Sequence, residues 1–285
     1  MTNDKKIIKI FNSRIACLFL IKNKDSINRI IKVCLYPDQL YMDDDFFEIT
    51  NGVLYEHNFY KEHNDLLDIN DVKLFDDFTY NQLEEYLCIK SEIMKNVLFE
   101  TLIKEYNFYI KSVENFFISN RNNIRFVVID MLYIEGDKFI KYMNDFDSIK
   151  IYFIQILNKL KIFEENRIIH NDLHLVNIII NKEKAIIYDF DLSYSEKLGK
   201  NINCLEEFGY INVFVKKFDL MKLCYHIYKN ISDRDSFLDI ILVDDKKEIM
   251  KKYFFDQKNI NKKELFDINL CKNFKDIDDI LNLIK

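Results

Sequence analysis

Residues 167–193, RIIHNDLHLVNIIINKEKAIIYDFDLS, constrain the fold more than any other stretch of the chain. Two runs rich in Ile, Leu and Val indicate buried strands, and the polar turn NKEK separates them. If residues 178–180 and 185–188 pair as a hairpin, the side chains of Asn177 and Asp189 meet at its open end. The sequence therefore predicts an apolar hairpin that carries polar groups at that end.

Five side chains that can bind protons or metals interrupt this apolar stretch: His170, Asp172, His174, Asn177 and Asp189. The Asp189 carboxylate and the Asn177 amide oxygen suit a hard cation such as Mg²⁺, which also takes phosphate oxygens as ligands. Asp172 is then free to accept a proton from an attacking hydroxyl. This division of labour is typical of phosphoryl transfer, in which the protein supplies positioning and charge neutralisation.

The string HNDLHLVN…DFD resembles the catalytic loop and metal-binding motif of the protein-kinase-like superfamily, H-x-D-x-x-x-x-N followed by D-F-G or D-F-D. The resemblance implies an ATP-dependent kinase in which Asp172 is the catalytic base. It also implies that Asn177 and Asp189 hold Mg²⁺, and that His170 is a structural residue packed under the loop.

Three segments elsewhere fit the same family. RIIKVCLY places Lys32 on a strand, LYEHNFY offers Glu56, and KKFDLMKLC offers Asp219. By resemblance, Lys32 reaches the α- and β-phosphates of ATP, Glu56 holds the Lys32 ammonium, and Asp219 supports the catalytic loop from beneath. The resemblance spans roughly residues 7 to 230 in the family's order.

The glycine-rich loop of the family is missing. Its three glycine positions fall near Phe11, Ser13 and Ala16, and none of these is glycine. Backbone amides need room to approach phosphates, and glycine provides that room. Because Ser13 and Ala16 are small, the resemblance still assigns them to the nucleotide site.

The particular residues of the motif indicate the kind of phosphate acceptor. DLH, with His174, and DFD are similar to small-molecule kinases of the aminoglycoside and choline types, and to divergent kinases of large DNA viruses. There is no A-P-E motif between Asp189 and Asp219, so the usual peptide-docking platform is unsupported. The acceptor is a hydroxyl, and we expect a protein Ser/Thr in preference to a small molecule.

The order of predicted elements favours an α+β, two-lobed protein-kinase-like fold. The small antiparallel-sheet N-lobe covers residues 1–132 and the mainly helical C-lobe covers residues 133–285 with the hairpin 167–193. The N-lobe is expected to hold a strand meander over 7–36, a helix over 53–67 with Glu56, and a helical insertion over about 81–117. Alternatively, the stretch 81–117 is itself the Glu-bearing helix, with Glu92 or Glu100 as the partner of Lys32.

Composition excludes several classes of protein. With 49% hydrophobic and 31% charged residues the chain is globular, and a net charge of −6 argues against a nucleic-acid partner. The six cysteines form no C-x-x-C pair, which favours reduced thiols in a cytoplasmic setting. The apolar run IACLFLI is too short to span a membrane. Few Gly and Pro residues, together with DLH…DFD, resemble kinases of large cytoplasmic DNA viruses, which would place the protein in the host cytoplasm.

Two other functions stay open beside an ATP- and Mg²⁺-dependent protein Ser/Thr kinase. A small-molecule kinase acting on an aminoglycoside, a choline-like alcohol or a sugar would use an acidic pocket, and SDRDSFLDIILVDD after residue 231 supplies carboxylates. A pseudokinase, a binding module without turnover, is favoured by the lost glycines. Against it stand Asp172, Asn177, Asp189 and Lys32, for which a chain without turnover has no chemical need.

Ordinary structural roles compete with the functional ones. His170 and His174 could be read as an i, i+4 zinc pair. Lys32 could protect an edge strand from aggregation. Glu56 could lie on a solvated helix face, and Asp219 could cap the helix that follows it.

Overall fold

The computed structural model describes residues 6–12, 16–22, 28–35, 44–69, 71–89, 92–107, 124–256 and 265–285. The chain divides into two compact units, and each is described by itself. The N-terminal unit comprises Met1–Asp65 and Ile69–Tyr133, and the C-terminal unit comprises Leu66–Asp68 and Ile134–Lys285.

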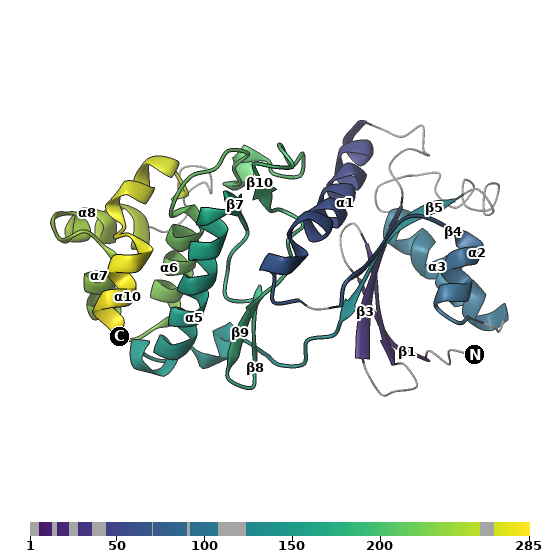
Figure 1. Cartoon of the computed structure of the whole chain (residues 1–285), viewed down its shortest axis with the longest axis horizontal. Coiled ribbons are helices and arrows are strands. Elements are labelled where there is room, and N and C mark those ends of the chain that lie inside the picture. The colour runs from purple at the N-terminus through teal and green to yellow at the C-terminus, as the bar shows by residue number, and fades with distance from the viewer. Residues whose placement is uncertain are drawn as a thin grey trace. The chain divides into compact units, whose positions relative to one another are not determined.

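A five-stranded antiparallel sheet forms the centre of the N-terminal unit, with strand order β1-β2-β3-β5-β4 (Figure 1). Its strands are β1 (Lys6–Asn12), β2 (Cys17–Lys22), β3 (Asn28–Leu35), β4 (Lys73–Thr79) and β5 (Arg125–Leu132). The predicted meander over residues 7–36 is confirmed, because β1, β2 and β3 pair in sequence order through short connections.

Helices cover both faces of this sheet (Figure 1). They are α1 (Asp44–His63) on one face and α2 (Tyr80–Tyr86) and α3 (Glu92–Asn107) on the other. Ile31 and Val33 of β3 belong to the apolar cluster that α2 and α3 complete, whereas Cys34 packs with Leu54 of α1. Since side chains alternate along a strand, Lys32 lies on the face that α1 covers.

The helical insertion predicted over 81–117 differs in the structure. The Thr79 side chain caps α2, and the chain breaks at Cys88, which has a positive φ of 55°. The helix α3 then begins anew, and residues 108–123 lie outside the described residues. The preceding strand β4, KLFDDFT, was not predicted, because two adjacent aspartates and a register shift between Phe75 and Phe78 break the apolar alternation.

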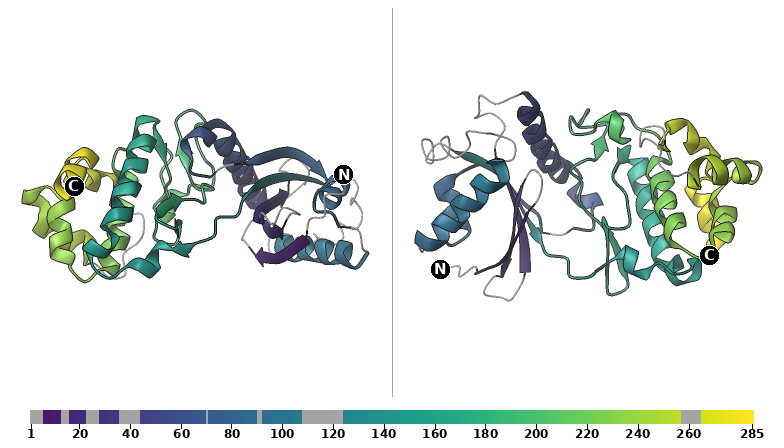
Figure 2. Two further views of the ribbon diagram at one scale, coloured as in Figure 1. Left: turned by 60° about the horizontal axis from the view of Figure 1, so that its bottom comes forward. Right: turned by 180° about the vertical axis from the view of Figure 1, so that it is seen from behind.

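Helices are the main regular elements of the C-terminal unit. Their bounds are α5 (Phe146–Glu165), α6 (Phe218–Asn230), α7 (Arg234–Ile241), α8 (Lys247–Met250), which runs into a π-helical turn (Lys251–Phe255), and α10 (Ile277–Ile284). A capping box between Asp145 and Ser148 starts α5. The buried side chains of α5 recur at three- and four-residue spacing: Ile149, Phe153, Ile156, Leu157, Leu160 and Phe163. This apolar stripe is why α5 lies at the centre of the unit, side by side with α6 (Figures 1 and 2).

Two small sheets complete the C-terminal unit. One pairs β6 (Asp137–Lys138), β8 (Ile178–Asn181) and β9 (Lys184–Ile187), and the other pairs β7 (Ile168–Ile169) with β10 (Tyr194–Ser195). The hairpin predicted about NKEK is therefore confirmed. It packs against α5, and Gln155 of that helix bonds to the backbone at its turn.

The prediction of an α+β fold is confirmed, with an antiparallel sheet in one unit and mainly helices in the other. This arrangement is compatible with a two-lobed kinase-like fold. Along the described part of the chain, no helix combines the length and the apolar character that crossing a membrane requires.

Candidate active site

The loop 170–177 links β7 to β8, and Asp219 of α6 holds its first turn. The Asp219 carboxylate accepts the backbone N–H groups of His170, at 2.6 Å, and Asn171, at 3.0 Å. The cap of α6 is Lys217, so the interpretation of Asp219 as a cap of its own helix is wrong. Burial raises the pKa of Asp219, while the neighbouring His170 and the two backbone N–H groups act in the opposite direction.

His170 ties the loop to the strand that leads to Asp189. Its ring is fully buried, and Nε2 lies 2.9 Å from the carbonyl oxygen of Tyr188. Since a carbonyl can only accept, Nε2 carries the proton, and Nδ1 presents a lone pair to which no described residue donates. Burial lowers the pKa of His170, so the ring is neutral at pH 7.

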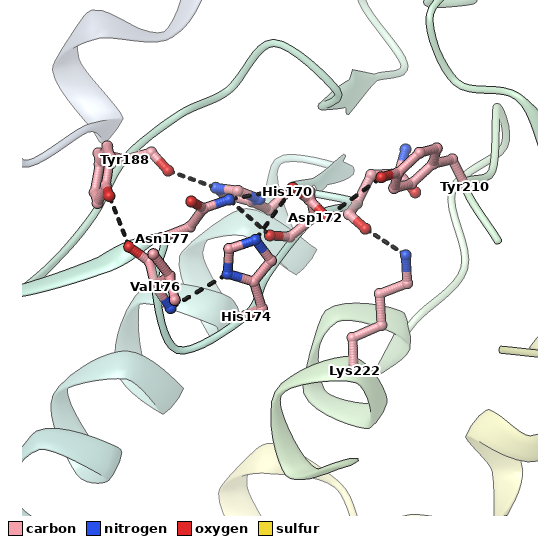
Figure 3. A network of polar contacts seen from close by, with 9 residues as sticks. His170, Asp172, His174, Val176, Asn177, Tyr188, Tyr210 and Lys222 are labelled. Atoms are coloured by element: carbon pink, nitrogen blue, oxygen red, sulfur yellow. Dashed lines mark hydrogen bonds and ion pairs between the residues drawn. The ribbon is translucent and has the colours of Figure 1, made fainter. Parts of the chain in front are cut away.

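Asp172 is held from one side by the rest of the loop (Figure 3). The Asn177 amide donates to the Asp172 carbonyl oxygen at 3.0 Å and to its Oδ2 at 3.3 Å. The backbone N–H of Val176 donates to His174 Nδ1 at 3.2 Å, which leaves the His174 proton on Nε2, 3.5 Å from Asp172 Oδ2. Asp172 therefore keeps a carboxylate that is 28% exposed and partly hydrogen-bonded.

The Asp172 carboxyl is ionised at pH 7. Burial acts to raise its pKa, but the contact with His174 and the charge of Lys222 act in the opposite direction, and the pKa lies below its usual range. An ionised, half-exposed carboxylate can accept a proton from a hydroxyl that approaches within hydrogen-bonding distance.

Asn177 and Asp189 flank the open end of the hairpin. The Tyr188 backbone N–H donates to the Asn177 carbonyl at 3.2 Å, which extends the β8–β9 pairing by one residue and brings Asp189 next to it. Because the Asn177 amide nitrogen bonds to Asp172, its oxygen is left as an acceptor, and no described residue donates to it.

The donor set at this end of the hairpin fits Mg²⁺. One amide oxygen and one carboxylate are hard donors, and Mg²⁺ usually takes its remaining ligands from water and phosphate. Among the described residues no three His, Cys, Asp or Glu side chains gather into a metal-binding group, so a softer ion such as Zn²⁺ finds no cage there.

Backbone strain concentrates in the same segment. Seven described non-glycine residues have positive φ, and four of them lie between residues 167 and 189: Arg167, Asn171, Lys182 and Asp189. Such conformations cost free energy and gather at functional sites, where the surrounding contacts enforce them. The φ of 69° at Asp189 marks a side chain that the fold orients at some cost.

In the N-terminal unit, the structure brings Lys32 and Glu56 together. Lys32 Nζ lies 2.5 Å from Glu56 Oε2, and both side chains are buried. The strand β3 pairs on both sides, so the interpretation of Lys32 as an edge-strand lysine is wrong, as is that of Glu56 as a solvated residue. Glu100 is exposed on α3, and the Glu92 side chain lies outside the described residues.

Of the two residues assigned to the missing glycine-rich loop, the structure describes Ala16. Ala16 is fully buried immediately before β2, where it packs with Cys34 and Val127. Ser13 lies outside the described residues.

Three residues that sequence reasoning missed support Asp172. Asn171, with φ 68°, exchanges two hydrogen bonds with the Ile211 backbone, at 2.8 and 3.0 Å. The buried Lys222 donates to the Asn171 carbonyl at 2.5 Å and lies over the Tyr210 ring, whose hydroxyl is 3.5 Å from Asp172 Oδ1. A lysine inside the apolar run DLMKLC was the one sequence signal that pointed to this support.

The acidic residues after position 231 face lysines on the surface of the C-terminal unit. Lys251 pairs with Asp235 at 2.6 Å, and Lys247 pairs with Asp239. The Asp233 carboxylate accepts the backbone N–H of Phe146. These three carboxylates therefore contact groups of the protein itself.

The fold can be compared with known proteins now that the site is described. No family model matches the chain. Over 96 residues, 32% of this chain, it is 34% identical to a protein of Acanthamoeba polyphaga mimivirus named "Putative serine/threonine-protein kinase". The matched region covers 18% of that protein, so the chain spans less than a fifth of its length. This partial similarity suggests a kinase-like protein in general terms.

Proposed function

We propose that the protein is an ATP- and Mg²⁺-dependent phosphotransferase of the protein-kinase-like fold that transfers the γ-phosphoryl group to a Ser or Thr hydroxyl of a protein. The observation that carries the proposal is the arrangement at the hairpin. Asn177 bonds to Asp172, and the Asp172 carboxylate stays ionised and half-exposed.

In the proposed reaction, Asp172 accepts the proton of the acceptor hydroxyl as the hydroxyl oxygen attacks the γ-phosphorus. The bond between the γ-phosphorus and the bridging β–γ oxygen breaks, and ADP leaves with that oxygen. Asn177 and Asp189 would hold Mg²⁺, which neutralises charge on the phosphates. Lys32, kept in place by Glu56, would contact the α- and β-phosphates.

The acceptor is assigned from two observations. The named similarity is to a serine/threonine-protein kinase. The carboxylates that favoured a small cationic alcohol are engaged with lysines and backbone groups of the chain itself. Both favour a protein hydroxyl, with the host cytoplasm as the setting if the chain is viral.

Thermal unfolding with ATP plus Mg²⁺, ATP plus EDTA, and GTP plus Mg²⁺ tests the nucleotide site. A ligand that binds only the folded state at one hundred times its dissociation constant stabilises that state by about 2.7 kcal/mol. We expect a Mg²⁺-dependent rise in Tm for the parent protein and its loss in Asp189→Ala. Glu183→Ala, which removes an exposed carboxylate at the opposite end of the same hairpin, should keep the rise.

Transfer itself is then measured with γ-labelled ATP and a mixture of Ser/Thr peptides, beside choline and an aminoglycoside. Label in peptides supports the proposal, and label in the small alcohols alone would replace the protein acceptor with a small molecule. Nucleotide binding without transfer to any acceptor or to water would make the protein a binding module.

A further inference from the structure

Lys138 lies in the short strand β6, which pairs with strand β8 of the β8–β9 hairpin. Asp137 and Lys138 pair with Ile180 and Ile179 of β8. A Cβ atom on Gly136 would lie 2.4 Å from the Ile180 carbonyl oxygen, so only glycine allows β6 to approach β8 this closely. The backbone of Lys138 is thus held in a defined position relative to the open end of the hairpin.

The Lys138 ammonium stands over an aromatic ring beside the candidate metal ligand. Its Nζ lies 4.1 Å from the centroid of Tyr188, the residue before Asp189. The Tyr188 hydroxyl donates to the Val176 carbonyl at 2.6 Å, which fixes the ring. A cation over a ring face keeps its N–H donors on the other side available for hydrogen bonds.

This ammonium is half-buried, and among the described residues it has no anionic partner within ion-pairing distance. Burial lowers the pKa of Lys138, and the negative charge of Asp189 opposes that shift. No carboxylate of a described residue lies within ion-pairing distance of its Nζ, because the adjacent Asp137 pairs with Lys141 instead. A partly desolvated cation without a counter-charge raises the free energy of the site, and an incoming anion lowers it.

We propose that Lys138 binds the phosphate oxygens of the nucleotide at the Asp189 end of the hairpin. This inference rests on the proposed function, since it assigns a further residue to the same phosphate site. Asp189 would supply the metal-facing charge, and Lys138, whose Nζ lies over the ring of the preceding residue, would supply a direct cation. The chain lacks the glycines whose backbone amides would otherwise surround phosphates, so a side-chain cation has more to contribute here.

The contribution of Lys138 depends on the number of phosphates in the ligand. A contact to phosphate oxygens weakens binding of ATP and ADP when it is removed, and leaves adenosine unaffected. A lysine that merely packs on Tyr188 would instead affect all three ligands alike, through the shape of the hairpin.

The test compares dissociation constants of ATP, ADP and adenosine, with Mg²⁺, for the parent, Lys138→Met, Lys138→Arg and Lys141→Met. Lys141→Met is the matched control, because Lys141 lies three residues away, is exposed and pairs with Asp137. We expect Lys138→Met to weaken ATP binding on the order of tenfold, the effect of one charge-assisted hydrogen bond. Lys138→Arg, Lys141→Met and all adenosine values should stay within about twofold of the parent.

An ATP constant for Lys138→Met within twofold of the parent, or an equal loss for adenosine, would overturn the inference while the proposed function stands. If the parent binds no nucleotide, the proposed function fails, and inorganic tripolyphosphate becomes the probe. Tripolyphosphate bound by the parent and lost in Lys138→Met would keep Lys138 as a polyphosphate-binding residue. Tripolyphosphate bound equally by both, or by neither, would overturn it.

Discussion

The ionic groups of the two units differ in how deeply they are buried and in how close their partner groups lie. In the N-terminal unit, the Lys32 and Glu56 side chains are 8% and 2% exposed and lie 2.5 Å apart. In the C-terminal unit, Asp172 is 28% exposed, and its oxygens lie 3.3 to 3.5 Å from the groups that face them. The first is a closed pair inside a core, and the second is an open carboxylate on a loop.

This difference separates stability from chemistry. A buried ion pair becomes part of the folded structure, because removing one partner leaves an uncompensated charge in a low-dielectric core. A partly exposed carboxylate with only long contacts is screened by water. Its loss should cost little stability and should mainly lower the rate of the reaction that it assists. Substitution of Lys32 or Glu56 should therefore lower stability, whereas substitution of Asp172 should lower the rate of phosphoryl transfer.

The largest expected effect is on turnover, at Asp172. Asp172→Asn preserves the shape of the side chain but removes the proton acceptor, so phosphoryl transfer should fall by about 10²- to 10⁴-fold. Tm should change little, because only long contacts hold the carboxylate. The rate is measured with labelled ATP and the Tm by thermal unfolding. Parent-like turnover would contradict the role of Asp172, and a collapse in Tm would contradict the comparison.

The next effect is on stability, at Glu56. Glu56→Ala should lower the free energy of unfolding by about 3–5 kcal/mol, because it removes the carboxylate that lies 2.5 Å from the buried Lys32 ammonium. Urea denaturation measures the change. Glu100→Ala, at an exposed position of α3, is the control and should stay within about 0.5 kcal/mol of the parent.

A double variant sharpens this result. Lys32→Met combined with Glu56→Leu replaces both charges by apolar groups and should recover most of the lost stability. If the double variant were no more stable than Glu56→Ala, packing of the α1 helix, and not the unpaired charge, would explain the loss.

A smaller effect is expected at a second buried network of the N-terminal unit. Arg29 Nε lies 2.5 Å from Asp130 Oδ1, and the Tyr86 hydroxyl donates to the other oxygen of that carboxylate. Tyr86→Phe removes one donor to a buried charge and should cost about 1.5–3 kcal/mol. Since Arg29 remains, the cost should be below that of Glu56→Ala, and urea denaturation compares the two. An equal or larger loss would mean that this network, not the Lys32 pair, is the less compensated of the two.

The smallest effect is a pH dependence that both units share. Burial lowers the pKa of His57 and of His170 below 6.5. The unfolded chain therefore takes up protons first, so stability is complete above about pH 6.5 and is lost as pH falls below it. Each histidine contributes at most about 1.4 kcal/mol per pH unit.

Urea denaturation between pH 7.5 and 5.5 measures this slope. His57→Gln and His170→Gln should each reduce it. A slope unchanged in both variants would assign the acid sensitivity to other groups.

The sequence by itself determined the local patterns. The apolar runs around NKEK predicted the hairpin, the short connections predicted the meander, and the spacing of Asp172, Asn177 and Asp189 placed them on one loop and one hairpin end. Each of these depends on residues close in sequence, where strand alternation and turn chemistry decide the structure.

Only the tertiary structure decided which distant residues meet. It brought Glu56, not Glu100, to Lys32, made Asp219 a support for the loop and not a cap, and placed Asn171 against Ile211, 40 residues away. The strand β4 formed against β5 despite its two aspartates, because pairing in a sheet depends on the partner strand. Such contacts depend on burial and packing of the whole unit, which no local pattern in the chain encodes.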